Sequence, residues 1–152
     1  MKKPAIPANE KQRQAALESY AILDSSPEMA YDDIATLASM ICGTPIALVT
    51  LIDNDRQWFK ANVGLDAAET SRDISFCGHA IHDVKVFEVD DARLDERFAD
   101  NPLVQEGPKI RFYAGAPLID RQGFALGTLC VIDKEPKKLS ADQIKALEAL
   151  AR

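Results

Sequence analysis

Two strand-like segments joined by a short polar turn constrain the fold of this chain more than any other feature of its sequence. Residues 110–119 and 124–132 are mainly apolar, and the turn Asp120–Gly123 separates them. Such a pair is typical of an antiparallel hairpin. A third segment, residues 46–52, is apolar almost without interruption. This pattern predicts a strand that is buried on both faces in the centre of a sheet.

The remaining strands and the helices are predicted from periodicity and from residues that start or stop helices. Residues 57–63 alternate as a hairpin partner and residues 84–89 form another strand, whereas residues 65–73 are expected to be a polar loop. Ser140 and Gln143 have the spacing of a capping box at the start of a final helix. The other expected helices cover residues 10–22, 27–42, 76–82 and 90–98.

The helix predicted at residues 27–42 has the clearest boundaries. Ser26 is its expected N-cap, Pro27 occupies the first helical position and Gly43 follows its end. Asn9 and Gln12 resemble a capping box for the preceding helix. The apolar stripe of the 27–42 helix is expected to consist of Tyr31, Ile34, Leu37, Ala38 and Ile41.

Together these elements describe an α+β domain with an antiparallel sheet of five to six strands covered by helices. The chain has 152 residues, enough for one domain with a sizeable core. Residues 1–9 have no helix or strand pattern and are expected to be disordered or extended. The single domain is therefore expected to occupy residues 10–152.

Composition excludes several classes of function. The formal net charge of −6 disfavours binding to nucleic acid or to an anionic membrane surface. No apolar run approaches the roughly 20 residues of a spanning helix, and no apolar segment follows the charged N-terminus as in a secretory signal, so a cytoplasmic location is expected. The three cysteines, Cys42, Cys77 and Cys130, have neither disulfide-framework nor zinc-site spacing, which favours reduced thiols.

Four motifs, in order along the chain, carry a resemblance to a known family. They are SFCGHAI at residues 75–81, VDDARLDERFADNP at 89–102, RFYAGAPL at 111–118 and GTLCVID at 127–133. With them, residues 10–152 resemble a GAF domain, particularly the subgroup at the N-terminus of bacterial sensor histidine kinases and diguanylate cyclases. The resemblance implies a PAS-like fold, with helices from both chain ends on one face of the sheet and a roofed ligand pocket on the other.

The resemblance also implies a function in bacterial signal transduction. An unidentified small molecule would bind in the pocket and shift the packing of the terminal helices, which would act on a downstream kinase or cyclase domain or partner. The domain itself contains no Walker, GxSxG or HExxH motif, so it is not expected to be an enzyme. Ile144, Leu147 and Ala151 have the spacing of a helix seam and are the candidates for a homodimer contact.

The candidate pocket residues are aromatic, polar and charged side chains on or beside the expected pocket walls. They are Trp58, Phe59, Phe76, Cys77, His79, Asp90, Arg111, Phe112 and Tyr113. Arg111 either pairs with an anionic ligand or ties the roof down through Asp90 or Asp95. The acidic residues between Asp90 and Asp100 alternate with two arginines, which favours a salt-bridged surface segment over a general acid–base pair.

Cys77 admits several alternative interpretations. Helical geometry places Cys77 and His79 on opposite sides, which disfavours a metal site with His82 and Asp83. A bilin attachment is disfavoured because Gly78 separates the cysteine from the histidine. A thiol-dependent enzyme resembling the free methionine sulfoxide reductases would use Cys77 as its nucleophile, but Cys42 and Cys130 both resemble small buried hydrophobes, so a resolving thiol is not expected.

A further alternative is a structural dimerisation module without a ligand. In this case the large side chains of Trp58, Phe76, Phe112 and Tyr113 would themselves fill the pocket.

Overall fold

The computed structural model describes residues 1–152 and has an α+β fold with a six-stranded antiparallel sheet. Strand order is β3-β2-β1-β6-β5-β4, so the strand predicted to lie in the centre of the sheet, β1, does so beside β6. The strands are β1 (Ile46–Ile52), β2 (Arg56–Val63), β3 (Glu69–Ser71), β4 (Phe87–Val89), β5 (Phe112–Ile119) and β6 (Ala125–Asp133). The helices are α1 (Glu10–Ser19), α2 (Met29–Cys42), α3 (Cys77–Ala80), α4 (Pro102–Gln105) and α5 (Ala141–Leu150), with 3-10 turns η1 (Arg72–Ile74) and η2 (Ala92–Leu94).

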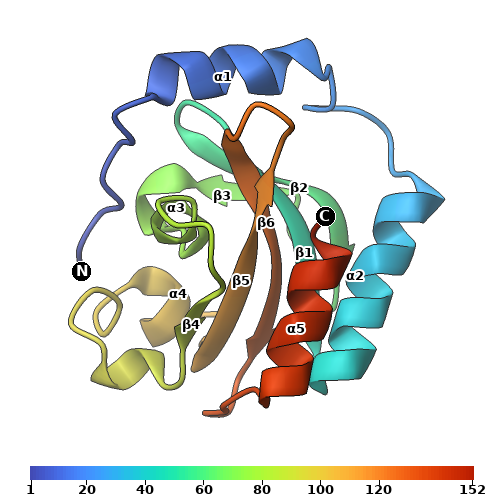
Figure 1. Cartoon of the computed structure of the whole chain (residues 1–152). Helices are drawn as coiled ribbons and strands as arrows, with labels where there is room; N and C mark the ends of the chain where they lie inside the picture. Colours follow the sequence, from blue (N-terminus) through green and yellow to red (C-terminus); the bar gives the residue numbers. More distant parts are fainter.

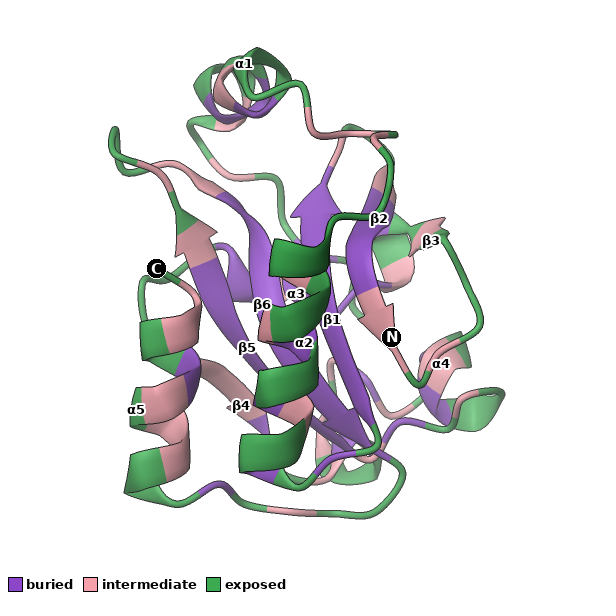
Figure 2. Cartoon of the chain, turned by 90° about the vertical axis from the view of Figure 1, so that its right-hand side faces the viewer, coloured by how far each residue is buried: buried purple, intermediate pink, exposed green.

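The helices divide between the two faces and one end of the sheet. Figure 1 shows α2 and α5 side by side on one face, α3 and α4 on the other, and α1 across one end. In Figure 2 the strands behind α2 and α5 are purple, because the centre of the sheet is buried, while the outer surfaces of both helices are green. The predicted fold class is confirmed, although α2 rather than α1 packs beside α5 on one face, with irregular segments on the other.

Alternating side chains of the central strands form the two larger of three hydrophobic cores. On the helix face, Val49, Phe112 and Leu129 pack against α2 and α5. On the opposite face, Leu48 and Tyr113 belong to a separate core that includes α3 and the segments around α4. Neighbouring residues of one strand therefore serve different layers, as the pleat of a β-strand requires.

Helix α2 buries only part of its predicted stripe. Its buried residues are Ala35, Ala38 and Cys42, whereas Leu37 and Ile41 are 45% and 41% exposed. Tyr31 and Ile34 of the predicted stripe are partly buried against the same core, so the buried face is shifted toward the small residues. Its end is as predicted, because Gly43 adopts the left-handed conformation with φ of 64°.

The starts of the helices are predicted less well, except for α5. Asn9 forms no side-chain cap, and α2 begins at Met29 rather than after Ser26. Helix α1 ends at Ser19, and the chain then turns through Ala21 with φ of 53°. The capping box of α5 is confirmed, since the side chains of Ser140 and Gln143 each bond the other's backbone N–H.

Three elements depart from the prediction on the pocket face. The loop predicted at residues 65–73 contains the short edge strand β3, which pairs with β2. Helix α4 was not predicted, although Asn101 accepts a hydrogen bond from the N–H of Leu103 as its cap. The helix predicted at residues 90–98 is reduced to the single 3-10 turn η2.

A buried charge cluster fastens α1 to the end of the sheet. Glu10 accepts hydrogen bonds from Arg13 at 2.9 Å and from Arg72 at 2.6 Å. Both arginines are buried, and Arg13 also donates to the carbonyl of Ile52 at 2.8 Å while Arg72 donates to that of Asp53 at 2.9 Å. One carboxylate thus connects a helix, the end of β1 and η1.

Candidate functional site

A cavity of about 350 Å³ lies between the sheet and the irregular segments opposite α2 and α5. The sheet contributes its floor, including Leu48, Phe59 and Ile132. Its roof consists of residues from two segments, 65–77 and 103–110. Eleven of its 16 lining residues are hydrophobic, which makes it a predominantly apolar site.

Gln57 is the polar group that the protein leaves incompletely paired in this cavity. Its Nε2 donates to Thr70 Oγ1 at 3.0 Å, but its buried Oε1 has no hydrogen-bond partner. A buried acceptor without a partner costs about 1–3 kcal/mol. A bound molecule with an N–H or O–H group would therefore find an available acceptor at Gln57.

The second polar feature of the cavity wall is a cluster of hydrogen-bonded side chains around Cys77. Its Sγ accepts hydrogen bonds from Tyr113 Oη and Thr128 Oγ1, both at 3.0 Å, and lies 3.9 Å from Cys130 Sγ. Burial raises the pKa of Cys77, but hydrogen bonds with Cys130, Thr128 and Tyr113 outweigh burial and lower it to about 7. Burial and the neighbouring Cys77 instead raise the pKa of Cys130.

The position of Tyr113 depends on a glycine in the same strand. A Cβ atom at Gly115 would lie 2.2 Å from Tyr113 Oη. Any larger residue at position 115 would displace the hydroxyl from Cys77. The glycine therefore keeps open the space through which the Tyr113 side chain reaches the sulphur.

The cavity contains four of the nine predicted pocket residues. Phe59, Phe76, Cys77 and Tyr113 line it. Sequence reasoning missed Gln57, Leu48 and Cys130, among other lining residues. A signal for Gln57 was available, because residues two positions apart share a face of a strand. Alternation from Phe59 leads to Gln57 on the same face.

The other five predicted pocket residues do not line this cavity. Trp58 packs with Leu17 beneath α1, and Phe112 belongs to the core under α2 and α5. Both are strand neighbours of residues that line the cavity and so point to the other face. The remaining three, His79, Asp90 and Arg111, are held by local contacts.

These local contacts explain the positions of the charged candidates. His79 Nε2 lies 3.1 Å from the carbonyl oxygen of Lys2 and its ring meets Phe98 edge-on. Arg111 donates to the carbonyl of Val104 at 2.9 Å, so it ties the roof to the sheet through backbone rather than through a carboxylate. Asp90 lies 3.8 Å from Lys138 at the surface.

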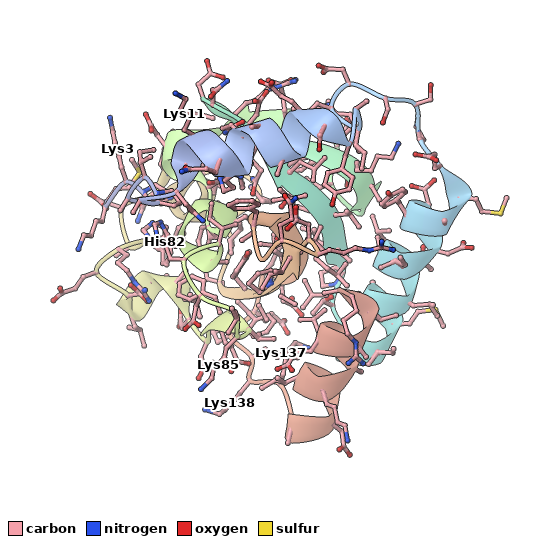
Figure 3. The ribbon with its side chains drawn as sticks, turned by 45° about the horizontal axis from the view of Figure 1, so that its top comes forward. Lys3, Lys11, His82, Lys85, Lys137 and Lys138 are labelled. Carbon is pink, nitrogen blue, oxygen red and sulfur yellow. The ribbon has the colours of Figure 1, made fainter.

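The acidic segment forms the salt-bridged surface that its arginines predicted. Asp91 pairs with Arg93 at 2.8 Å and Asp95 pairs with Arg97 at 2.7 Å. The cations also lie away from the cavity: Figure 3 labels six basic residues at the surface of the molecule, Lys3, Lys11, His82, Lys85, Lys137 and Lys138. None of these residues lines the cavity.

An antiparallel sheet with paired helices on one face and a roofed cavity on the other is the PAS-like arrangement that the sequence motifs predicted. The chain belongs to the GAF domain family, whose model matches residues 26–152. No helix in the structure has the length and apolar character needed to cross a membrane.

Comparisons with individual proteins agree with this assignment. The chain is 46% identical over 153 residues to a Pseudomonas aeruginosa protein named a cyclic di-GMP phosphodiesterase, covering all of this chain and 26% of that protein. The GAF domain of the Acinetobacter phosphoenolpyruvate-protein phosphotransferase has a TM-score of 0.64 at 19% identity, covering 92% of this chain and 88% of that one. The Thermosynechococcus elongatus PixJ GAF domain has a TM-score of 0.63 at 18% identity, with 97% and 85% covered.

Proposed function

We propose that this chain is the small-molecule-sensing domain of a bacterial signalling protein and regulates an effector outside this segment. The observation that carries the proposal is the roofed apolar cavity with the unpaired Oε1 of Gln57 in its wall. The Pseudomonas relative, which is named a cyclic di-GMP phosphodiesterase, supports the signalling role. This chain spans about a quarter of the length of that relative. We propose that its phosphodiesterase activity lies in another part of that protein, and that a comparable effector is the target here.

The lining of the cavity defines the chemistry of the proposed ligand. Asp66, at the exposed edge of the roof, is its one charged residue, and no arginine or lysine lines it. A cyclic nucleotide would bring a phosphate to a site without a cation to pair with it. The cavity instead suits a compact, mainly apolar molecule with one hydrogen-bond donor for Gln57.

The cavity also bears on the alternative of a ligand-free structural module. Trp58 and Phe112 point to the other face, and the side chains that remain leave about 350 Å³ open. A dry cavity of roughly 150 Å³ is known to accept benzene, so this space is large enough for a bicyclic molecule. The structure therefore favours a binding domain over a self-filled one.

Helix α5 is the proposed route from the cavity to the effector. It packs on the sheet face opposite the cavity, and Leu147, one of the three predicted seam residues, is 1% exposed because it is buried against that sheet. Leu147 cannot also form a dimer seam. Ile144 and Ala151 are half-buried and remain the proposed dimer contacts.

Indole and benzofuran test the proposed ligand chemistry, since they have nearly the same shape and only indole has an N–H group. We expect indole to raise the Tm saturably. At a hundredfold excess over Kd, the free energy of unfolding should rise by about 2.7 kcal/mol. Benzofuran should bind more weakly because it leaves Gln57 Oε1 unpaired. The measurement is thermal unfolding of the full 152-residue chain across a titration of each compound.

Gln57→Leu provides the control, because it removes the acceptor and keeps an apolar wall of similar size. The preference for indole over benzofuran should disappear in this variant. An absence of any shift with both compounds would contradict the proposed site. An indole preference that persists in Gln57→Leu would show that Gln57 does not select the ligand.

A further inference from the structure

Two sulphur atoms meet in the wall of the cavity. Cys77 lies at the start of α3 and Cys130 near the middle of β6, and their Sγ atoms are 3.9 Å apart. Both residues are buried, and both line the cavity. The third cysteine, Cys42, lies in the core on the opposite face of the sheet. Cys130 is therefore the thiol that lies beside Cys77.

The surroundings of Cys77 differ from those of an inert buried cysteine. Hydroxyl groups of Tyr113 and Thr128 both donate to its sulphur at 3.0 Å. Thr128 Oγ1 also lies 3.1 Å from Thr50 Oγ1. While Thr128 donates its hydroxyl proton to Cys77, it can accept a hydrogen bond from Thr50. Donors of this kind stabilise a thiolate, which is the reactive form of cysteine.

We propose that Cys77 and Cys130 form a peroxide-reactive dithiol whose substrates are hydroperoxides entering the apolar cavity. Cys77 Sγ attacks the O–O bond, giving a sulfenic acid and an alcohol; the proton that Cys77 loses on ionising balances the one taken up by the alkoxide. Cys130 Sγ then attacks Cys77 Sγ, the S–O bond breaks, and the Cys130 proton leaves with hydroxide as water. Two thiols are oxidised to one disulfide, and one peroxide is reduced to alcohol and water.

The distance between the sulphurs requires only a small local movement for the second step. An S–S bond is about 2.05 Å long, so the sulphurs must approach by roughly 2 Å. Cys77 belongs to a four-residue helix above the sheet, whereas Cys130 is in a central strand. The movement would therefore fall on α3 and the adjoining roof. The proposal does not require a resident ligand, although it uses the same cavity.

Thiol counting and peptide mapping of the full chain test this proposal. The reduced protein has three free cysteines, and treatment with cumene hydroperoxide should leave one, with Cys77 linked to Cys130. Because the cavity is apolar, cumene hydroperoxide should react faster than hydrogen peroxide at equal concentration. The matched variant Cys42→Ser should form the same disulfide at the same rate.

Two further variants separate the proposed roles. Cys130→Ser should stop at a Cys77 sulfenic acid that dimedone traps. Tyr113→Phe should slow oxidation about two- to fivefold at neutral pH, since a higher Cys77 pKa reduces the thiolate fraction more than it increases nucleophilicity. Three remaining thiols in the wild-type protein, or disulfides that involve Cys42, would overturn the proposal. Faster reaction with hydrogen peroxide would overturn the assigned substrate class.

Discussion

Replacing Glu10 with glutamine is expected to lower the free energy of unfolding by about 3–5 kcal/mol, because it leaves two buried arginines without their anion. Arg13 and Arg72 both donate to this carboxylate, and neither has another carboxylate within ion-pair distance. Urea denaturation at pH 7 measures the loss. Glu18→Gln is the matched control, since Glu18 is exposed on the same helix and its replacement should change stability by less than about 0.5 kcal/mol.

The same carboxylate predicts a pH dependence. Although burial opposes ionisation, hydrogen bonds from Arg72, Arg13 and Gln14 hold the pKa of Glu10 well below its usual range. The unfolded chain then binds a proton at higher pH than the folded one, so the contribution of Glu10 is complete above about pH 5 and is lost as the pH falls toward the folded-state pKa. The stability of Glu10→Gln should fall less than that of the wild type between pH 5 and pH 3. Equal slopes would contradict this account of the cluster.

Replacing Phe98 with alanine is expected to cost about 3–5 kcal/mol of stability, the range for removing a buried aromatic side chain. Phe98 is fully buried and stacks on Phe76, with ring centroids 4.0 Å apart, while the guanidinium of Arg97 lies 4.9 Å from the Phe87 ring beside it. Because Phe76 lines the cavity, the loss should loosen the roof as well as the core. Thermal and urea unfolding measure the first effect, and the indole-induced rise in Tm measures the second.

Leu94→Ala is the matched control for Phe98→Ala. Leu94 lies four residues earlier in the same segment but is 84% exposed. Its removal should change stability by less than about 0.5 kcal/mol and leave the response to indole unchanged. A Phe98→Ala protein that is destabilised but responds fully to indole would show that the Phe76–Phe98 stack does not hold the roof.

Elements with strong local signals were predictable from the sequence. Strand β1 is apolar except for Thr50, and α5 begins at a capping box, so neither depends on distant residues. Strand β3 was missed because its three residues are a strand only through pairing with β2. The stripe of α2 was wrong only for Leu37 and Ile41, because the sheet selects small residues such as Ala35, which no local pattern reveals.

The site was predicted only in part, for a similar physical reason. Alternation shows that Phe112 and Tyr113 face opposite sides of a strand, but it does not show which side has the cavity. Cys130 resembled a small core residue because its neighbour across the sheet face, Cys77, is 53 positions away in the sequence. Motif resemblance located the segments that surround the cavity, whereas the contacts of individual side chains required the structure.

Amide hydrogen exchange of the full chain with and without indole tests the central claim, that the roofed cavity is the ligand site. Bound indole should slow exchange in residues 65–77 and 103–110, which form the roof, and leave α1 unchanged. Benzofuran is expected to bind too weakly to fill the site at the same concentration, so it should not give this protection. Protection confined to other segments would contradict the assignment of the cavity as the binding site. So would an absence of protection at an indole concentration that raises the Tm.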